Sequence, residues 1–186
     1  MLKALRQVLG GRIGTEHRAS DLADWMPVPS GVDIVIMDSR ESSVRVGIEL
    51  KSYKLDETLW DIIKMASLRR MTGVEAAYVV VAATSKKFDG SGDCAALFQT
   101  RLGEATSWES SSWFDRWPTA WADLLRGGSA RPSRMSSTVS LELISRHKLT
   151  ATAKWEIRAL RVENPEEQDW IKFDSSGWPH SRLVDG

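Results

Sequence analysis

Three charged side chains lie inside otherwise apolar stretches of "GVDIVIMDSRESSVRVGIELKSYK", residues 31–54. Asp33 opens the first apolar run, and Glu49 and Lys51 stand near the end of the second. An isolated carboxylate in an apolar setting is costly unless a cation or hydrogen bonds compensate it. Two carboxylates that lie together therefore require a cation. Carboxylate oxygens completed by water and phosphate oxygens suit Mg²⁺ better than zinc.

Lys51 adds a positive charge beside these two acids. An ammonium group near a metal-bound water and a phosphate can orient the nucleophile and offset the charge that develops in an in-line displacement. The triplet therefore predicts phosphodiester hydrolysis. The alternative is a structural pair between Glu49 and Lys51 on the solvated face of an edge strand, with Asp33 capping a turn.

The elements around the triplet decide whether its members can converge. Strands are expected at 33–38 and 44–51, joined by the polar turn "SRESS". Since side chains alternate along a strand, Glu49 and Lys51 share one face. In an antiparallel hairpin the start of one strand lies beside the end of the next, so we expect Asp33 to meet them at one end of the sheet.

Further elements are predicted on both sides of this hairpin. An amphipathic helix at 2–9 ends at two glycines, and a first strand is expected at 12–18. A second amphipathic helix at 56–72 is followed by an apolar, valine-rich strand at 76–84. The predicted order is helix, strand, strand, strand, helix, strand.

The residues "GVDIVI" and "VGIELKSYK", followed by a helix and an apolar strand, resemble the PD-(D/E)XK, or restriction-endonuclease-like, nuclease superfamily. The resemblance covers about residues 1–85. It implies an α/β fold with a restriction-endonuclease-like core, α-β-β-β-α-β, in which helices flank a mixed central sheet.

The resemblance also implies roles for individual residues. Asp33, Glu49 and Lys51 would be catalytic. Asp33, Glu49 and the backbone carbonyl of Leu50 would bind Mg²⁺, for which Mn²⁺ can substitute. In this fold the second helix packs near the site, so Asp61 and Lys64, which lie off its apolar stripe, are candidates for a supporting role.

One departure from the superfamily pattern keeps a second function open. Many members carry an acidic residue on the first helix, but "LKALRQVL" has none, and Glu16 lies downstream of it. A second metal is therefore in doubt. The alternative is a nuclease-like binding module without catalysis, which recognises a protein or a nucleic acid.

The 186 residues, 42% of them apolar, are enough for a single domain over 1–186. Within it we expect the nuclease-like core at 1–85, a helical tryptophan-rich region with a linker at 86–135, and a C-terminal β-hairpin extension at 136–186. The prolines, glycines and serines of "GGSARPSRMSS" mark the linker.

The chain carries 25 basic and 25 acidic residues, but the balance is uneven along its length. Between 126 and 161 only Glu142 and Glu156 oppose eight basic residues: Arg126, Arg131, Arg134, Arg146, Lys148, Lys154, Arg158 and Arg161. Such a segment can hold a phosphate backbone, DNA rather than RNA by the resemblance. The alternative is a solvated hairpin whose charges only maintain solubility.

Nine tryptophans are the other unusual feature of the composition. Trp113, Trp117 and Trp121 recur at helical spacing, which favours core packing. A face for a protein partner or a homodimer is the alternative, and base stacking is a weaker one.

The remaining composition points to a compartment and excludes several kinds of site. A single cysteine, Cys94, excludes an intramolecular disulfide framework and a multi-cysteine zinc site, which fits a reducing, cytoplasmic location. His17, His147 and His180 lack metal-ligand spacing. No stretch reaches membrane-spanning length, so no membrane partner is expected.

Overall fold

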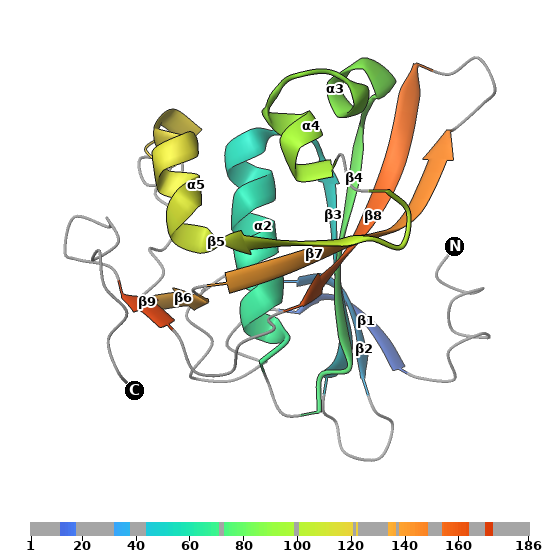
Figure 1. Cartoon of the computed structure of the whole chain (residues 1–186). Helices are drawn as coiled ribbons and strands as arrows, with labels where there is room; N and C mark the ends of the chain where they lie inside the picture. The colour runs from blue at the N-terminus through green and yellow to red at the C-terminus, as the bar shows by residue number, and fades with distance from the viewer. Residues whose placement is uncertain are drawn as a thin grey trace.

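The structure is a computed structural model. It describes residues 12–17, 32–37, 44–70, 73–98, 101–120, 122, 134–136, 138–148, 154–163 and 170–172. In chain order its elements are β1 (Arg12–His17), β2 (Val32–Met37), β3 (Val44–Ser52), α2 (Leu55–Leu68), β4 (Ala76–Thr84), α3 (Ser85–Asp89), α4 (Asp93–Phe98), β5 (Ala105–Glu109), α5 (Ser110–Arg116), β6 (Arg134–Ser136), β7 (Thr138–Lys148), β8 (Trp155–Glu163) and β9 (Trp170–Lys172) (Figure 1).

A mixed seven-stranded sheet forms the centre of an α/β fold, in the order β1-β2-β3-β4-β8-β7-β5 (Figure 1). β1, β2 and β3 are antiparallel neighbours. β3 and β4 are parallel, and β8, β7 and β5 continue the sheet in antiparallel pairs. β6 and β9 form a separate two-stranded sheet. The sheet therefore changes from antiparallel to parallel pairing next to β3.

Helix α2 makes the crossover that two parallel neighbours require. It connects the end of β3 to the start of β4 and lies across the sheet (Figure 1). Every residue from Thr58 to Leu68 is buried. Because this part of the helix is covered all round, its polar side chains must find partners inside the protein.

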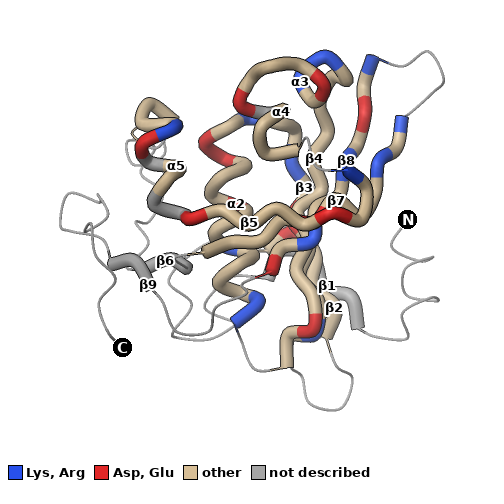
Figure 2. Tube along the Cα trace, viewed as in Figure 1, with Lys and Arg blue, Asp and Glu red and all other residues tan. Residues whose placement is uncertain are grey.

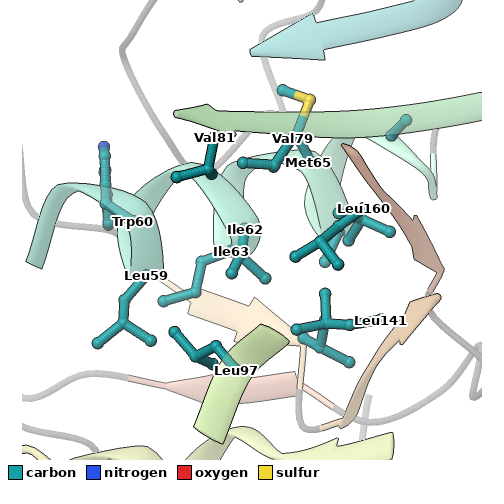
Figure 3. Close-up of a cluster of buried hydrophobic side chains, with 14 of the residues drawn as sticks. Leu59, Trp60, Ile62, Ile63, Met65, Val79, Val81, Leu97, Leu141 and Leu160 are labelled. Atoms are coloured by element: carbon teal, nitrogen blue, oxygen red, sulfur yellow. The ribbon is translucent and has the colours of Figure 1, made fainter. Parts of the chain in front are cut away.

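The main core lies between α2 and the sheet (Figure 3). Leu59, Ile62 and Ile63 of α2 pack with residues of β4, β7, β8 and α4, among them Val79, Val81, Leu97, Leu141 and Leu160. This agrees with the predicted apolar stripe of the helix. The stripe covers one side of α2 only, which leaves another side for the polar residues discussed below.

Gly47 sets how closely α2 approaches β3. A Cβ atom at this position would lie 2.2 Å from Leu68 Cδ2 and 3.6 Å from Met65 Sδ. Leu68 is fully buried and has little room to move. Residue 47 therefore faces the helix, and so do Glu49 and Lys51, which share its side of the strand.

The predicted elements of the core are confirmed wherever the structure describes them. Strands near 12–18, 33–38, 44–51 and 76–84 and the helix from 56 are all present with small shifts at their ends. The helix expected at 2–9 lies outside the described residues. Within the described part, no helix combines the length and the apolar character that a membrane span needs.

Two predictions for the second half need correction. The C-terminal hairpin forms as β7 and β8, but it does not extend the core from outside, because β8 pairs directly with β4 within the main sheet. The region 86–135, predicted to be helical with a linker, also contains the strand β5. "ATSWE" is an edge strand with one exposed face. Its polar sequence is typical of a loop, and its strand conformation depends on pairing with β7.

Candidate active site

The site lies at the end of β3 that leads into α2. Glu49 is only 2% exposed, and β3 is an internal strand between β2 and β4. The alternative of a Glu49–Lys51 pair on the solvated face of an edge strand is therefore wrong. Both side chains find their ionic partners on α2.

The strand and the helix run in opposite directions and stay in register. Two residues of strand advance roughly 6.6 Å, and three or four residues of helix advance roughly 4.5–6 Å. Gly47 therefore faces Leu68, Glu49 faces Lys64, and Lys51 faces Asp61. Each step toward the end of β3 meets a residue about one turn nearer the start of α2.

These contacts form a row of alternating charges, Glu49, Lys64, Asp61, Lys51 and Glu57, which we call the charge row. Lys64 Nζ lies 2.6 Å from Glu49 Oε1 and 3.2 Å from Asp61 Oδ1. Lys51 Nζ lies 3.3 Å from Asp61 Oδ2 and 3.5 Å from Glu57 Oε2. Each lysine therefore bridges two carboxylates.

Asp33 reaches the same place from β2. Its Oδ2 accepts a 2.8 Å hydrogen bond from the backbone N–H of Leu50. The register pairs Ile34 with Ile48, so the next position places Asp33 across from Glu49 on the same side of the sheet. The structure thus brings Asp33, Glu49, Lys51 and the Leu50 backbone together, as the sequence predicted.

Burial and charge alter the acid–base properties of this region. Burial raises the pKa of Glu49 to about 7; attraction to Lys64 opposes the rise, and the Asp61 and Asp33 carboxylates add to it. Burial also raises the pKa of Asp61 against the pull of Lys64 and Lys51. Burial acts to lower the pKa of Lys51, but Asp61, Glu57 and Glu49 outweigh it and leave it raised.

The residues present fit a divalent cation in two respects. The charge row and Asp33 together hold four carboxylates and two ammonium groups, an excess of two negative charges when all are ionised. Glu49 Oε1 is buried without a partner in hydrogen-bond geometry, although Lys64 is within ion-pair distance. Both observations favour a further cation with oxygen ligands.

The protein ligands are few. In the described ranges, no group of three or more histidine, cysteine, aspartate or glutamate residues is placed to hold a metal ion. A site on Asp33 and Glu49 would therefore be completed by the Leu50 carbonyl, water and substrate oxygens. Mg²⁺ commonly takes one or two carboxylates in this way.

Asp61 and Lys64, predicted to support the site, contact Lys51 and Glu49 directly. Glu57 was missed. It precedes Asp61 by four residues on the same stripe of α2 as Lys64, so the helical period could have found it once that stripe was known to face β3.

The predicted basic segment is partly neutralised within the fold. Arg158 is buried, and its Nε and Nη2 lie 2.6 Å from Glu156 Oε1 and Asp89 Oδ1. Arg146 Nε lies 2.7 Å from the same glutamate oxygen. Burial acts to raise the pKa of Glu156, but hydrogen bonds from both arginines leave it lowered. Arg161 Nε likewise lies 2.7 Å from Glu163 Oε1, so these three of the eight basic residues are paired within the fold.

Four exposed lysines lie near the end of the sheet at which β3 and β4 finish. Lys148 and Lys154 lie at the tip of the β7–β8 hairpin, and Lys86 and Lys87 lie on α3 (Figure 2). The N–H of Ser85 donates a 2.7 Å hydrogen bond to the carbonyl of Lys154, which joins α3 to the hairpin. We call these four residues the lysine row. Arg126 and Arg131 lie outside the described residues, and the side chain of Arg134 is not described.

The tryptophan prediction is confirmed where it can be checked. Trp113 and Trp117 are 3% and 4% exposed and belong to the main core. Their rings lie 6.3 Å apart, and each is within 6.4 Å of the ring of half-buried Trp108. Trp121 lies outside the described residues. Core packing accounts for the described part of this cluster.

Of the three histidines, Cys94 and Glu16, only His147 has a described side chain. His147 is exposed at the hairpin tip, and the side chains of His17 and Cys94 are not described. His180 and the side chain of Glu16 also fall outside the described part.

Comparison of the chain with protein-family models, with curated proteins and with solved structures found no match.

Proposed function

We propose that this protein is a metal-dependent nuclease of the PD-(D/E)XK type that hydrolyses phosphodiester bonds of nucleic acid, DNA rather than RNA. The observation that carries the proposal is the convergence of Asp33, Glu49 and Lys51 at one end of β3, under α2. An antiparallel β1-β2-β3 unit, followed by the α2 crossover to a parallel β4, supports a restriction-endonuclease-like core.

In this proposal Asp33, Glu49 and the Leu50 carbonyl hold Mg²⁺, or Mn²⁺ in its place. The ion supplies Lewis acidity at the scissile phosphate. The Leu50 N–H fixes one oxygen of Asp33, which orients the carboxylate. Lys51, held between Asp61 and Glu57, places a positive charge where negative charge develops during the displacement.

The substrate would approach along the end of the sheet where β3 and β4 finish. The lysine row lies at this end, on α3 and at the tip of the β7–β8 hairpin (Figure 2). Lys87 Nζ sits 5.3 Å from the centre of the Tyr53 ring, two residues beyond Lys51. Exposed cations near the site can follow a phosphate backbone without reading its sequence.

A second function remains a candidate: a nuclease-like module that binds nucleic acid or protein without cleaving. The contact between Lys64 and Glu49 favours it, because the acid that would bind the metal already has an internal cation 2.6 Å away. The same lysine row would then serve binding alone.

The test is cleavage of single- and double-stranded DNA and RNA in Mg²⁺ or Mn²⁺. Wild type should cleave at least one substrate, and EDTA should abolish cleavage. Asp33→Ala and Lys51→Ala should each reduce the rate by about a hundredfold or more. Glu75→Ala is the matched control, because Glu75 is an exposed acid paired with Arg45 at the opposite end of β3 and β4.

The outcomes separate the two functions. Cleavage that survives both Asp33→Ala and Lys51→Ala would refute the assigned site. Absence of cleavage on every substrate, together with binding that weakens as salt rises, would favour the binding module.

A further inference from the structure

Lys64 lies next to one of the two acids proposed to bind the metal. Its ammonium group lies between Glu49 Oε1 and Asp61 Oδ1, at 2.6 and 3.2 Å. The Lys64 and Glu49 side chains are 4% and 3% exposed. Water therefore has little access to this contact, and the two charges act on each other with little screening.

We propose that Lys64 is a built-in counter-ion that competes with the divalent cation for Glu49. The inference rests on the proposed metal site. A Mg²⁺ ion bound to Glu49 would lie roughly 2.0–2.1 Å from a carboxylate oxygen. With the ammonium 2.6 Å from one of those oxygens, two like charges would share the same acid.

The charge row offers Lys64 another place when the metal arrives. Asp61 already contacts Lys64 and is itself buried, so the ammonium can turn from Glu49 toward Asp61 and remain paired. In the metal-free protein the same lysine keeps Glu49 from being a buried carboxylate without a cation. Lys64 thus stabilises the metal-free state and weakens metal binding.

A second feature points the same way. Glu49 Oε1 has no partner in hydrogen-bond geometry despite its short distance to Lys64. A buried ion pair repays the desolvation of its two charges only when the geometry of the contact is good. Glu49 Oε1 can therefore bind a better-placed cation, and the proposed metal ion can replace Lys64 at this oxygen.

The experiment measures Mn²⁺ affinity by isothermal titration calorimetry on the full chain. Lys64→Met should bind Mn²⁺ about tenfold more tightly than wild type or better, because a competing charge is removed. Lys54→Met is the matched control. It removes a lysine paired with Asp56 and Glu57 but not with Glu49, and should change affinity by no more than about threefold.

Glu49→Gln distinguishes failure of the inference from failure of the proposed function. If Glu49→Gln weakens Mn²⁺ binding while Lys64→Met leaves it unchanged, Lys64 is not a competitor and the metal site stands. If Glu49→Gln binds Mn²⁺ as tightly as wild type, or if neither wild type nor Lys64→Met binds it, neither the metal site nor the counter-ion role stands.

Thermal unfolding provides a second measurement, because Lys64→Met leaves a buried carboxylate without its neighbour. In EDTA this variant should melt below wild type, and Mn²⁺ should raise its melting temperature more than that of wild type. The double variant Glu49→Gln with Lys64→Met should lose this extra gain. An equal Mn²⁺ shift in wild type and Lys64→Met would overturn the inference.

Discussion

Glu49 of β3 and Lys64 of α2 form an ion pair with 2.6 Å between Oε1 and Nζ, and both side chains are almost fully buried. Burying two charges costs more than a simple contact returns unless further partners satisfy them. Asp61 supplies a second partner to Lys64 and is itself paired with Lys51, whereas the Asp33 carboxylate repels Glu49. Lys64 therefore offsets only part of the effect of burial and of the negative charge around Glu49, which leaves its pKa raised.

The raised pKa of Glu49 predicts how stability depends on pH. The folded protein has a pKa of about 7 at this residue against an ordinary value of 4.5, so between these values it holds a proton that the unfolded chain has lost. The free energy of unfolding should therefore fall as pH rises through this window, by about 3 kcal/mol from this group. Urea denaturation of wild type and Glu49→Gln in EDTA isolates the effect.

The difference in unfolding free energy between Glu49→Gln and wild type should shift in favour of the variant as pH rises from about 4.5 to about 7. Glu57→Gln gives the opposite sign, because a hydrogen bond from Lys54 is the largest cause of the lowered pKa of Glu57. Stability from Glu57 is present above its ordinary pKa and is lost as pH falls. A difference for Glu49→Gln that does not change with pH contradicts the prediction.

Gly47→Ala should destabilise the protein by about 1–3 kcal/mol, because the new Cβ meets the buried Leu68 side chain at the closest approach of α2 to β3. Chemical denaturation measures the loss. Gly92→Ala is the control, since a Cβ there has nothing within 4 Å, and it should change stability by no more than about 0.5 kcal/mol. Equal stability of the two variants would mean that α2 can move away from the strand.

The sequence predicted which side of β3 carries the charges, because the two-residue period of a strand fixes that relation. It could not predict the partner of Glu49. Lys64 is fifteen positions along the chain, and their contact depends on how deeply α2 sits on β3, which Gly47 decides through tertiary packing. Sequence periodicity shows which residues share a face and leaves open what that face touches.

The basic segment shows the same limit of local patterns. Its charge predicts a site for a phosphate backbone or a solvated hairpin, yet Arg158 points inward on β8, which lies between β4 and β7. The hairpin itself was predictable from its two apolar, alternating runs. Its place within the main sheet was not, because it depends on long-range pairing between β4 and β8.

Arg158→Ala should lower the free energy of unfolding by about 3–5 kcal/mol. The substitution leaves the fully buried Glu156 with only one arginine partner and removes the hydrogen bond to the Phe98 carbonyl. Arg161→Ala removes a neighbouring arginine that is 40% exposed and pairs with Glu163, and it should cost no more than about 1 kcal/mol. Thermal or urea unfolding compares them. Similar losses would mean that the buried ion pairs contribute little beyond surface ones.

Asp61→Asn should slow single-turnover cleavage about tenfold or more while substrate affinity stays near wild type, because Asp61 holds Lys51 at 3.3 Å without facing solvent. Loss of this carboxylate also removes a cause of the raised pKa of Lys51, so the alkaline limb of the rate profile should move to lower pH. Glu57→Gln, at a more exposed partner, should have the smaller effect. An unchanged pH profile would show that Asp61 does not act through Lys51.

The lysine row should determine how nucleic-acid binding responds to salt. Each phosphate contact adds about 0.7–0.9 to the slope of log affinity against log salt concentration. Lys148→Ala with Lys154→Ala should therefore lower the slope by up to about 1.4–1.8. Arg45→Ala, a cation at the opposite end of β3, should leave it unchanged. Contacts to phosphates do not distinguish base sequences, so the affinity of the double variant should fall equally for nucleic acids of unrelated sequence. A change for Arg45→Ala but not for the lysines would place the nucleic acid at the other end of the sheet, away from Lys51.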